Sequence, residues 1–362
     1  MSKPVPRPAV QKTAPYVPGE RALSGIEQPI KLSSNESPLG PSPRAIAAYH
    51  ALEPEMFRYP DAAQRALRAA ISNAYEVEAD RIICGNGSDE VLALLIRAYA
   101  GPGDEVLLSQ YSFAMCWTHA HMQGCEVVVA PEPECHISVD EILARVTTRT
   151  RLVILASPNN PCGTYLPREQ LHRLHAALPE HVILAIDAAY GDYVVARDYD
   201  CGFELARKAS NVFVTHTFSK LYGLAGLRVG WGYGPNEIVE TLNRIRTPFN
   251  VSAPAMVAAA AAVLDHRHVA KVREHNNRWL EQLTNECRAL GLEVVPSVTN
   301  FILIRFPDGK YSAARADEHL RSNGIIPRPV NAGGPERSLR ITIGLDSDNE
   351  AVIAALRSFM AS

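Results

Sequence analysis

The sequence lacks the patterns that mark several large classes of protein. Its formal net charge is −3 and it has no basic block, so we expect no nucleic-acid partner. No apolar run reaches the roughly 18 residues that a membrane span needs, so we expect no membrane partner. The proline-rich start has no apolar signal core. Its seven cysteines include no CxxC pair, which argues against a zinc site or a disulfide framework and favours reduced thiols in the cytoplasm.

The length and the order of the predicted elements indicate two domains. The chain has 362 residues, 47% of them hydrophobic, which is enough for more than one core. Short apolar strands alternate with helices between Arg81 and Gly232, which is typical of an α/β fold on a mainly parallel sheet. We therefore predict three parts: an N-terminal arm at 1–30, a large domain at 56–264, and a smaller α+β domain formed by 31–55 and 265–362.

Local signals place several helices within this plan. Asp61 reads as the N-cap of a helical pattern that continues to Tyr75. Ser138 and Glu141 have the spacing of a capping box. The stretch His268–Leu290 predicts a long amphipathic helix that bridges the two domains.

Four polar motifs each follow a predicted strand: GNGSDE (85–90), SPNNPCG (157–163), AIDAAYGDY (185–193) and THTFSK (215–220). In open α/β sheets, ligands bind at the carboxyl ends of the strands, so these motifs could converge on one site. The small residues of GNGSDE suit either a phosphate at a helix N-terminus or a simple tight turn. Glu90 occupies the position where a dinucleotide fingerprint needs its third glycine, which disfavours a nicotinamide dehydrogenase.

Lys220 is the residue with the clearest chemical implication. Taken alone, it reads as an exposed lysine on a turn. A lysine at the end of a buried strand, however, shifts its pKa readily and suits Schiff-base chemistry. Asp187 could be an N-cap, or it could face a cationic nitrogen. Together with Asp187, Ser219 and Arg228, Lys220 indicates pyridoxal phosphate, whose aldehyde a lysine holds and whose ring nitrogen an acidic residue pairs.

The sequence resembles the fold-type I pyridoxal-phosphate aminotransferases, and within them the histidinol-phosphate aminotransferase family. The resemblance runs from about Pro15 to the C-terminus. It rests on motifs that occur in this order: APYVPGE, KLSSNESPLGPSP, RYPD, GNGSDE, SPNNPCG, DAAY, TFSKLYGLAGLRVGWG, RTPFNVSAP and LRITIG.

This resemblance implies a role for each matching residue. Lys220 would bind the cofactor aldehyde, Asp187 the ring nitrogen, and Tyr190 and Asn160 the phenolic oxygen. The remaining cofactor contacts would come from Gly87, Ser88, Asp89, Thr217, Ser219 and Arg228 at the phosphate, Phe113 stacked on the ring, and Tyr59 of a neighbouring subunit in a homodimer with shared sites. Substrate would be bound by Tyr16, Asn35, Arg328 and Arg340.

The resemblance also implies a reaction, namely transfer of an amino group from L-histidinol phosphate to 2-oxoglutarate in histidine biosynthesis. An aromatic amino-acid aminotransferase, a decarboxylase of a phosphorylated amino acid and a non-catalytic binding protein remain as alternatives. Two departures from the family bear on substrate choice: Cys116 stands where a tyrosine is frequent, and the loop 331–338 lacks an aromatic residue. No metal site is predicted, because His119 and His121 have no acidic neighbours at ligand spacing.

Overall fold

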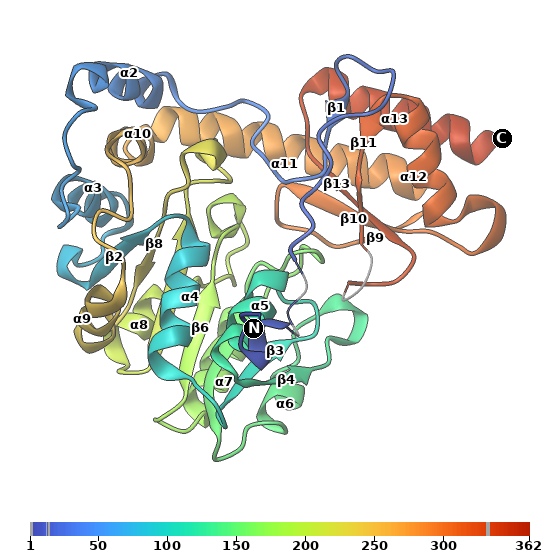
Figure 1. Ribbon diagram of the computed structural model, residues 1–362. Coiled ribbons are helices and arrows are strands. Elements are labelled where there is room, and N and C mark those ends of the chain that lie inside the picture. Colours follow the sequence, from blue (N-terminus) through green and yellow to red (C-terminus); the bar gives the residue numbers. More distant parts are fainter. Residues whose placement is uncertain (1–2, 12, 14, 331–333) are drawn as a thin grey trace.

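The structure is a computed structural model that describes residues 3–11, 13, 15–330 and 334–362, and its elements form two units (Figure 1). The larger unit contains a seven-stranded sheet. Its strands are β2 (Ile82–Gly85), β3 (Glu105–Ser109), β4 (Glu126–Ala130), β5 (Thr150–Ala156), β6 (Ile183–Asp187), β7 (Val212–Thr217) and β8 (Gly230–Tyr233).

The sheet has the order β2-β8-β7-β6-β5-β3-β4. The five strands from β7 to β4 pair in parallel, and β8 runs antiparallel to both of its neighbours. The predicted mainly parallel α/β sheet is therefore confirmed. The parallel strands are mostly apolar because helices cover both faces of the sheet, and their polar residues lie toward the strand ends.

Successive residues of each strand point into two different cores. Phe213 on β7 packs with α4 (Ser88–Tyr99), α5 (Ala114–Gln123) and α9 (Asn236–Ile245), whereas its neighbours Val212 and Val214 pack with the opposite core. The helices of that second face are α2 (Pro43–Ala51), α3 (Arg65–Tyr75), α6 (Val139–Leu143), α7 (Arg168–Ala177), α8 (Phe203–Lys208) and α10 (Ala253–Val263). This alternation is the two-residue period of a strand.

The smaller unit is an α+β layer with its own core. Its antiparallel sheet has the order β12-β13-β10-β9, and a separate parallel pair joins β1 to β11. These strands are β1 (Ile30–Lys31), β9 (Glu293–Val295), β10 (Phe301–Arg305), β11 (Ile325–Ile326), β12 (Arg328–Pro329) and β13 (Ser338–Thr342). The helices α12 (Ala313–Ser322) and α13 (Asp346–Ala361) pack on this core.

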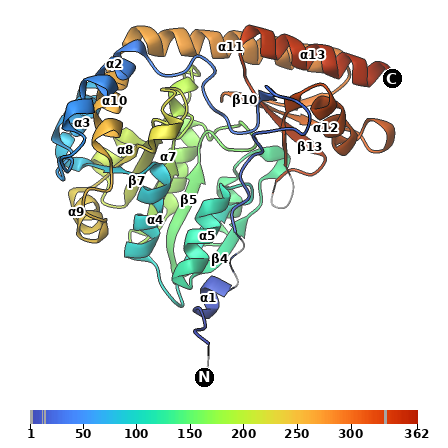
Figure 2. The same cartoon turned by 45° about the horizontal axis from the view of Figure 1, so that its top comes forward.

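The helix α11 (His266–Ala289) links the two units, as its sequence pattern predicted. Val272 near its start belongs to the core of the large sheet, and Trp279 and Leu283 belong to the core of the smaller unit. Figure 2 shows α11 running along the top of the molecule from one unit to the other. In the part of the chain that the structure describes, every helix is too short or too polar to span a membrane.

The segment predicted as the first part of the small domain, 31–55, is divided between the two cores. Leu32 packs in the smaller unit, but Ala45 on α2 packs in the large one, where α2 lies against α10. The apolar face of α2 thus has a partner that the sequence order does not reveal. In the arm, residues 8–11 form the short helix α1 (Pro8–Gln11), which lies against α5.

The N-cap predicted at Asp61 is wrong by three residues, because the N-cap position is Gln64. Helix α3 begins at Arg65, and Gln64 before it has a left-handed backbone with φ +56°. The Asp61 carboxylate instead accepts hydrogen bonds from the backbone N–H groups of Ala63 and Arg65, both at 3.0 Å. Asp61 therefore stabilises the turn that precedes the helix. The cap at Ser138 is confirmed, since its Oγ accepts from the N–H of Glu141.

Candidate active site

Most of the predicted site residues gather where the two units meet. Asp187 and Thr217 are the last residues of the neighbouring parallel strands β6 and β7, and Asn160 lies in the loop after β5. From the smaller unit, Arg340 on β13 donates a hydrogen bond to Asn160. The carboxyl ends of the sheet and the edge of the smaller unit therefore form one site, as expected for an open α/β sheet.

The backbone at the N-terminus of α4 forms a glycine-lined cradle that faces Arg228. Gly87 precedes the helix with φ +84°, and an added Cβ there would stand 2.6 Å from Nη2 of Arg228. A Cβ on Gly230 would stand 2.2 Å from the backbone nitrogen of Ser88, so only glycine permits this approach. Arg228 also donates to Ser219 Oγ at 3.2 Å. Free N–H groups, the positive end of the helix dipole and a guanidinium together attract an anion.

Lys220 lies between this cradle and the smaller unit. It is partly buried, and its Nζ donates to the backbone oxygen of Ser34 at 3.0 Å. Its ammonium lies 5.7 Å from the ring centre of Tyr190. Desolvation, with a further effect from the nearby positive charge of Arg340, lowers the pKa of Lys220 from 10.5 to about 7. A large share of this lysine is therefore neutral near pH 7.

Asp187 is a buried carboxyl group at the end of β6. Its Oδ1 accepts a hydrogen bond from Thr215 Oγ1 at 3.0 Å. Burial raises the pKa of Asp187 to about 6, although Thr215 and His216 act in the opposite direction. A buried carboxylate is stabilised by a cationic partner. The geometry favours the ligand-facing interpretation of Asp187 over an N-cap, since the next helical turn is a short 3₁₀ turn (Gly191–Tyr193) whose N-cap position is Tyr190.

Asn35 connects the two units from the centre of the site. Its Nδ2 donates to Tyr190 Oη at 2.8 Å, while its Oδ1 accepts from Thr342 Oγ1 at 3.0 Å. Burial raises the pKa of Tyr190 to about 12, so its hydroxyl remains protonated at neutral pH.

Arg340 is buried and has part of its guanidinium unused. Its Nη1 donates to Asn160 Oδ1 and its Nη2 to the backbone oxygen of Ser33 at 2.7 Å. Its Nε has no hydrogen-bond partner among the described residues. Burial lowers the pKa of Arg340, with a further decrease caused by Arg328. Arg328 and Arg340 are directly paired in the register of β12 and β13. Two adjacent arginines, one with an unpartnered N–H, suit an anionic ligand.

The other predicted residues occupy the rim of the site. Tyr16 is half exposed, and its ring packs edge-on against Phe113 with the ring centres 6.5 Å apart. Arg328 donates to the backbone oxygen of Val17 at 2.9 Å, so the arm crosses the entrance here. Asp89 lies in the first turn of α4 and accepts from His119 at 3.0 Å.

Tyr59 is the predicted residue that this chain does not bring to the site. Its side chain is 84% exposed and stacks on Phe249 at 4.6 Å. Two further exposed apolar residues, Met56 and Phe57, lie beside it in the sequence. Exposed aromatic side chains thus lie where the sequence predicts contact with a second subunit.

Five residues of the site were not predicted: Ser33, Ser34, Thr215, Asn300 and Thr342. The serines precede Asn35 in the motif KLSSNESPLG and offer backbone oxygens, which no side-chain pattern reveals. Thr215 and Thr342 stand two residues from the predicted Thr217 and Arg340, so the strand period could have found them. Asn300 donates to the backbone oxygen of Asn35 at 3.0 Å, a contact across 265 residues.

The residues present fit pyridoxal phosphate. The glycine cradle and Arg228 match its phosphate, the desolvated lysine its aldehyde, and the buried Asp187 its ring nitrogen. In addition, the described residues contain no cluster of three or more histidine, cysteine or acidic side chains arranged to bind a metal.

The fold and this site define the class of protein. The chain belongs to the aminotransferase class I and II family, whose model matches residues 27–356. The resemblance inferred from the motifs, the α/β fold and the assignment as an aminotransferase are thereby confirmed.

Within this family, the chain is most usefully compared with individual relatives that are similar over their full length. The chain is 49% identical to a histidinol-phosphate aminotransferase from Paramagnetospirillum magneticum and 50% identical to one from Rhodopseudomonas palustris strain HaA2, over the full length of both partners in each case. Its structure is similar to a crystal structure of histidinol-phosphate aminotransferase from Sinorhizobium meliloti in complex with pyridoxal-5'-phosphate. That comparison has a TM-score of 0.88 at 26% identity and covers 98% of this chain and 97% of the other.

Proposed function

We propose that the protein uses pyridoxal 5'-phosphate to transfer the amino group of L-histidinol phosphate to 2-oxoglutarate, giving imidazole acetol phosphate and glutamate in histidine biosynthesis. The observation that carries the choice of substrates is the pair Arg328 and Arg340 beside the lysine. A planar guanidinium binds phosphate and carboxylate in the same bidentate manner, so one site serves a phosphorylated donor and a dicarboxylate acceptor. The names of the full-length relatives support the same reaction.

The cofactor, when bound, supplies an aldehyde that exchanges amino groups and a ring that accepts an electron pair. Gly87, Ser88, Ser219 and Arg228 would hold its phosphate, assisted by Thr217 and by the backbone of Asp89. Phe113 would pack against the ring. Asn160 Oδ1 already accepts from Arg340, so its amide N–H group stays available for the phenolic oxygen, together with the Tyr190 hydroxyl.

Two titratable groups of the chain move or hold protons in this scheme. Lys220 Nζ would act as the base that removes a proton from the substrate α-carbon and as the acid that delivers a proton to the aldehyde carbon of the cofactor. A pKa of about 7 suits both roles, because the amine is neutral often enough to accept a proton and acidic enough to release it. The Asp187 carboxylate keeps the proton on the ring nitrogen, which is the reason for a carboxyl group buried at that strand end.

We also propose a homodimer with shared sites, in the cytoplasm. An aromatic patch supports the second subunit: Tyr59 and Phe249 stack on the surface, and Met56 and Phe57, close to Tyr59 in the sequence, are exposed. Large exposed apolar patches are uncommon on monomers. Tyr59 of one subunit would reach the phosphate of the other. The seven cysteines are all free thiols, which supports a reducing compartment.

Glutamate formation from 2-oxoglutarate tests the reaction. We expect histidinol phosphate to be the best donor, histidinol without its phosphate to be poor, and phenylalanine to be poorer than histidinol phosphate. Arg328→Ala should lower kcat/KM for histidinol phosphate on the order of a hundredfold, because it removes a charged hydrogen-bonding partner.

Arg278→Ala is the matched control, since Arg278 is an exposed arginine paired with Asp346 away from the site. A higher kcat/KM with phenylalanine would favour the aromatic aminotransferase. Release of carbon dioxide would favour the decarboxylase, and no turnover with any donor would favour a binding protein.

A further inference from the structure

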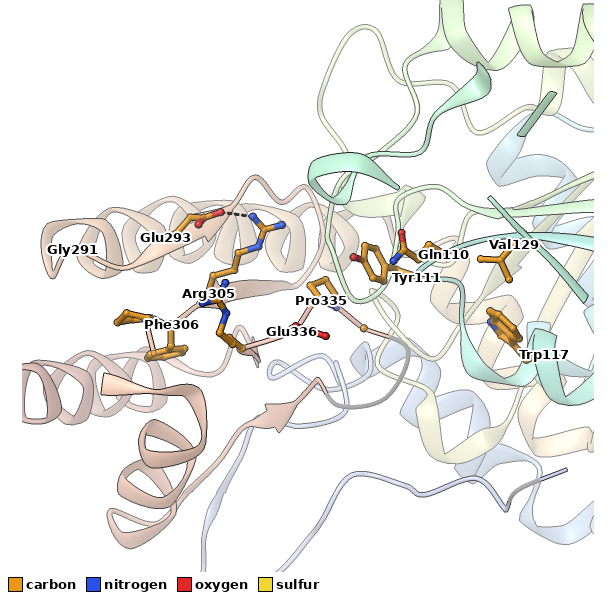
Figure 3. A pocket seen from close by; sticks show the side chains of 13 residues that line it. Gln110, Tyr111, Trp117, Val129, Gly291, Glu293, Arg305, Phe306, Pro335 and Glu336 are labelled. Atoms are coloured by element: carbon orange, nitrogen blue, oxygen red, sulfur yellow. Dashed lines mark hydrogen bonds and ion pairs between the residues drawn. The ribbon is translucent and has the colours of Figure 1, made fainter. Parts of the chain in front are cut away.

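A cavity of about 900 Å³ lies between the two units, on residues that the proposed reaction does not use (Figure 3). Tyr111 and Trp117 line it from the large unit, and Arg305 and Phe306 line it from the smaller one. Figure 3 shows Arg305 directed toward Glu293, with which it forms an ion pair at 2.6 Å.

Arg305, which lines this cavity, also contacts a buried cysteine. Its Nη2 donates to Sγ of Cys135 at 3.1 Å, so the guanidinium of the smaller unit contacts a thiol of the large one. Cys135 shares a small buried cluster with Cys162, Val295 and Leu303, against which Tyr111 also packs. A second thiol and a guanidinium therefore lie close to Cys135, and Arg305 and Tyr111, which contact this cluster, also line the cavity.

Two hydrogen bonds fix the segments that carry the two cysteines. Thr164 Oγ1 donates to the backbone oxygen of Cys135 at 2.6 Å, and Asn159 Nδ2 donates to Glu132 Oε2 at 2.8 Å. Glu134 and Cys135 both have left-handed backbones, with φ +49° and +63°. Consecutive non-glycine residues in this region are strained and occur preferentially at functional sites.

The electrostatics make the two thiols unequal. The Cys162 thiol and the Arg305 guanidinium lower the pKa of Cys135 to about 7, against the opposing effect of burial. The contact with Cys135 and burial raise the pKa of Cys162. The contact therefore favours the thiolate form of Cys135 and the protonated form of Cys162.

We propose that Cys135 and Cys162 form an oxidation-sensitive thiol pair, which a small hydroperoxide that enters through the interdomain cavity converts to a disulfide. The Cys135 thiolate attacks the terminal oxygen of the hydroperoxide ROOH, so that an S–O bond forms and the O–O bond breaks. The RO⁻ group leaves and is protonated to ROH, which is water where the oxidant is hydrogen peroxide. The Cys162 thiol then attacks this sulfenic acid, the S–S bond forms and the second oxygen leaves as water. Two thiols are oxidised and the hydroperoxide is reduced, so no other reactant is needed.

The disulfide has a consequence for the active site because Cys162 lies two residues after Asn160. Asn160 accepts the hydrogen bond of Arg340, so a covalent bond at 162 changes the position of that loop. Oxidation also removes the thiolate opposite Arg305. We therefore expect the oxidised enzyme to be less active and to recover when the bond is reduced.

Treatment of the holoenzyme with graded hydrogen peroxide tests the pair. In the wild type, the number of titratable thiols should fall by two, peptide mapping should show a link between 135 and 162, and dithiothreitol should restore both thiols and activity. Cys162→Ser should accumulate a sulfenic acid at 135 that dimedone traps. Peptide mapping depends on neither the substrate nor turnover. The thiol pair can therefore be confirmed or rejected whether or not the proposed reaction is correct.

Two variants separate the mechanism from a merely structural role. Arg305→Met should slow oxidation roughly tenfold at pH 7, where an ordinary thiol is only a few per cent ionised, and not at pH 9.5. Cys201→Ser is the matched control, because Cys201 is the one cysteine that is not buried, and it should react like the wild type. The proposal is overturned if peroxide links other cysteines, if both thiols persist in the inactivated enzyme, or if Arg305→Met reacts as fast as the wild type at pH 7.

Discussion

Lys220 destabilises the cofactor-free chain for the same reason that makes it reactive. Desolvation disfavours the ammonium, and the nearby charge of Arg340 adds to this effect. Among the described residues, its Nζ donates a hydrogen bond to the backbone oxygen of Ser34, and the charge of Glu36 partly opposes the lowering of the pKa. Lys220 is thus neutral at a pH at which it would be protonated in the unfolded chain. The free energy of unfolding should therefore depend on pH.

In the cofactor-free protein, Lys220→Met should raise stability most at pH 6 and progressively less toward pH 10. The folded pKa, about 7, lies below the unfolded value of 10.5, so the penalty is complete below pH 7 and disappears as the pH rises through this window. The gain should decrease by ~1.4 kcal/mol per pH unit. Urea unfolding at each pH measures it. Exposed Lys208→Met controls for the loss of one charge, and a pH-independent gain at 220 would contradict the shifted pKa.

At the scale of elements, the cradle depends on three segments that approach each other closely. The N-terminus of α4, the loop after β7 and the start of β8 meet at Gly87, Ser219 and Gly230. Each glycine removes a side chain that would fill the space of an anion or separate the elements. The packing of α2 also bears on the domain boundary. We propose to assign α2 to the large domain, because its buried face packs on α10.

Gly87→Ala should weaken cofactor binding at least tenfold, or ~1.4 kcal/mol, since the added methyl meets Arg228. The change also strains a backbone with positive φ. Gly103→Ala is therefore the control: Gly103 has φ +92° and open space around its Cβ position. Both variants should lose ~1–2 kcal/mol of stability. Equilibrium titration with the cofactor should show weaker binding by the Gly87 variant than by the Gly103 variant. Equal affinities would contradict the proposal that Gly87 forms part of the phosphate site.

At the scale of the whole molecule, the aromatic patch on the large unit marks the proposed contact between subunits. Phe57→Asp should convert a dimer to monomers in analytical ultracentrifugation, because it buries a charge against an apolar surface. If Tyr59 of one subunit contacts the cofactor phosphate of the other, the monomeric variant should also bind the cofactor more weakly. Val195→Asp, at a residue 70% exposed elsewhere, should leave the mass unchanged. A monomeric wild type would refute both the dimer and the shared site.

The sequence by itself determined the α/β class, the strands of the sheet, and the group of Lys220, Asp187, Asn160 and Arg228. These follow from patterns of a few residues and from the rule that the ends of parallel strands share an edge. Only the tertiary structure decided which distant groups complete the site. Arg340 and Asn160 meet across 180 residues, and Arg305 and Cys135 across 170. Such contacts depend on how the smaller unit packs against the sheet, and no local spacing in the sequence encodes this packing. The packing also sets the burial that lowers the pKa of Lys220 and brings Arg305 to Cys135.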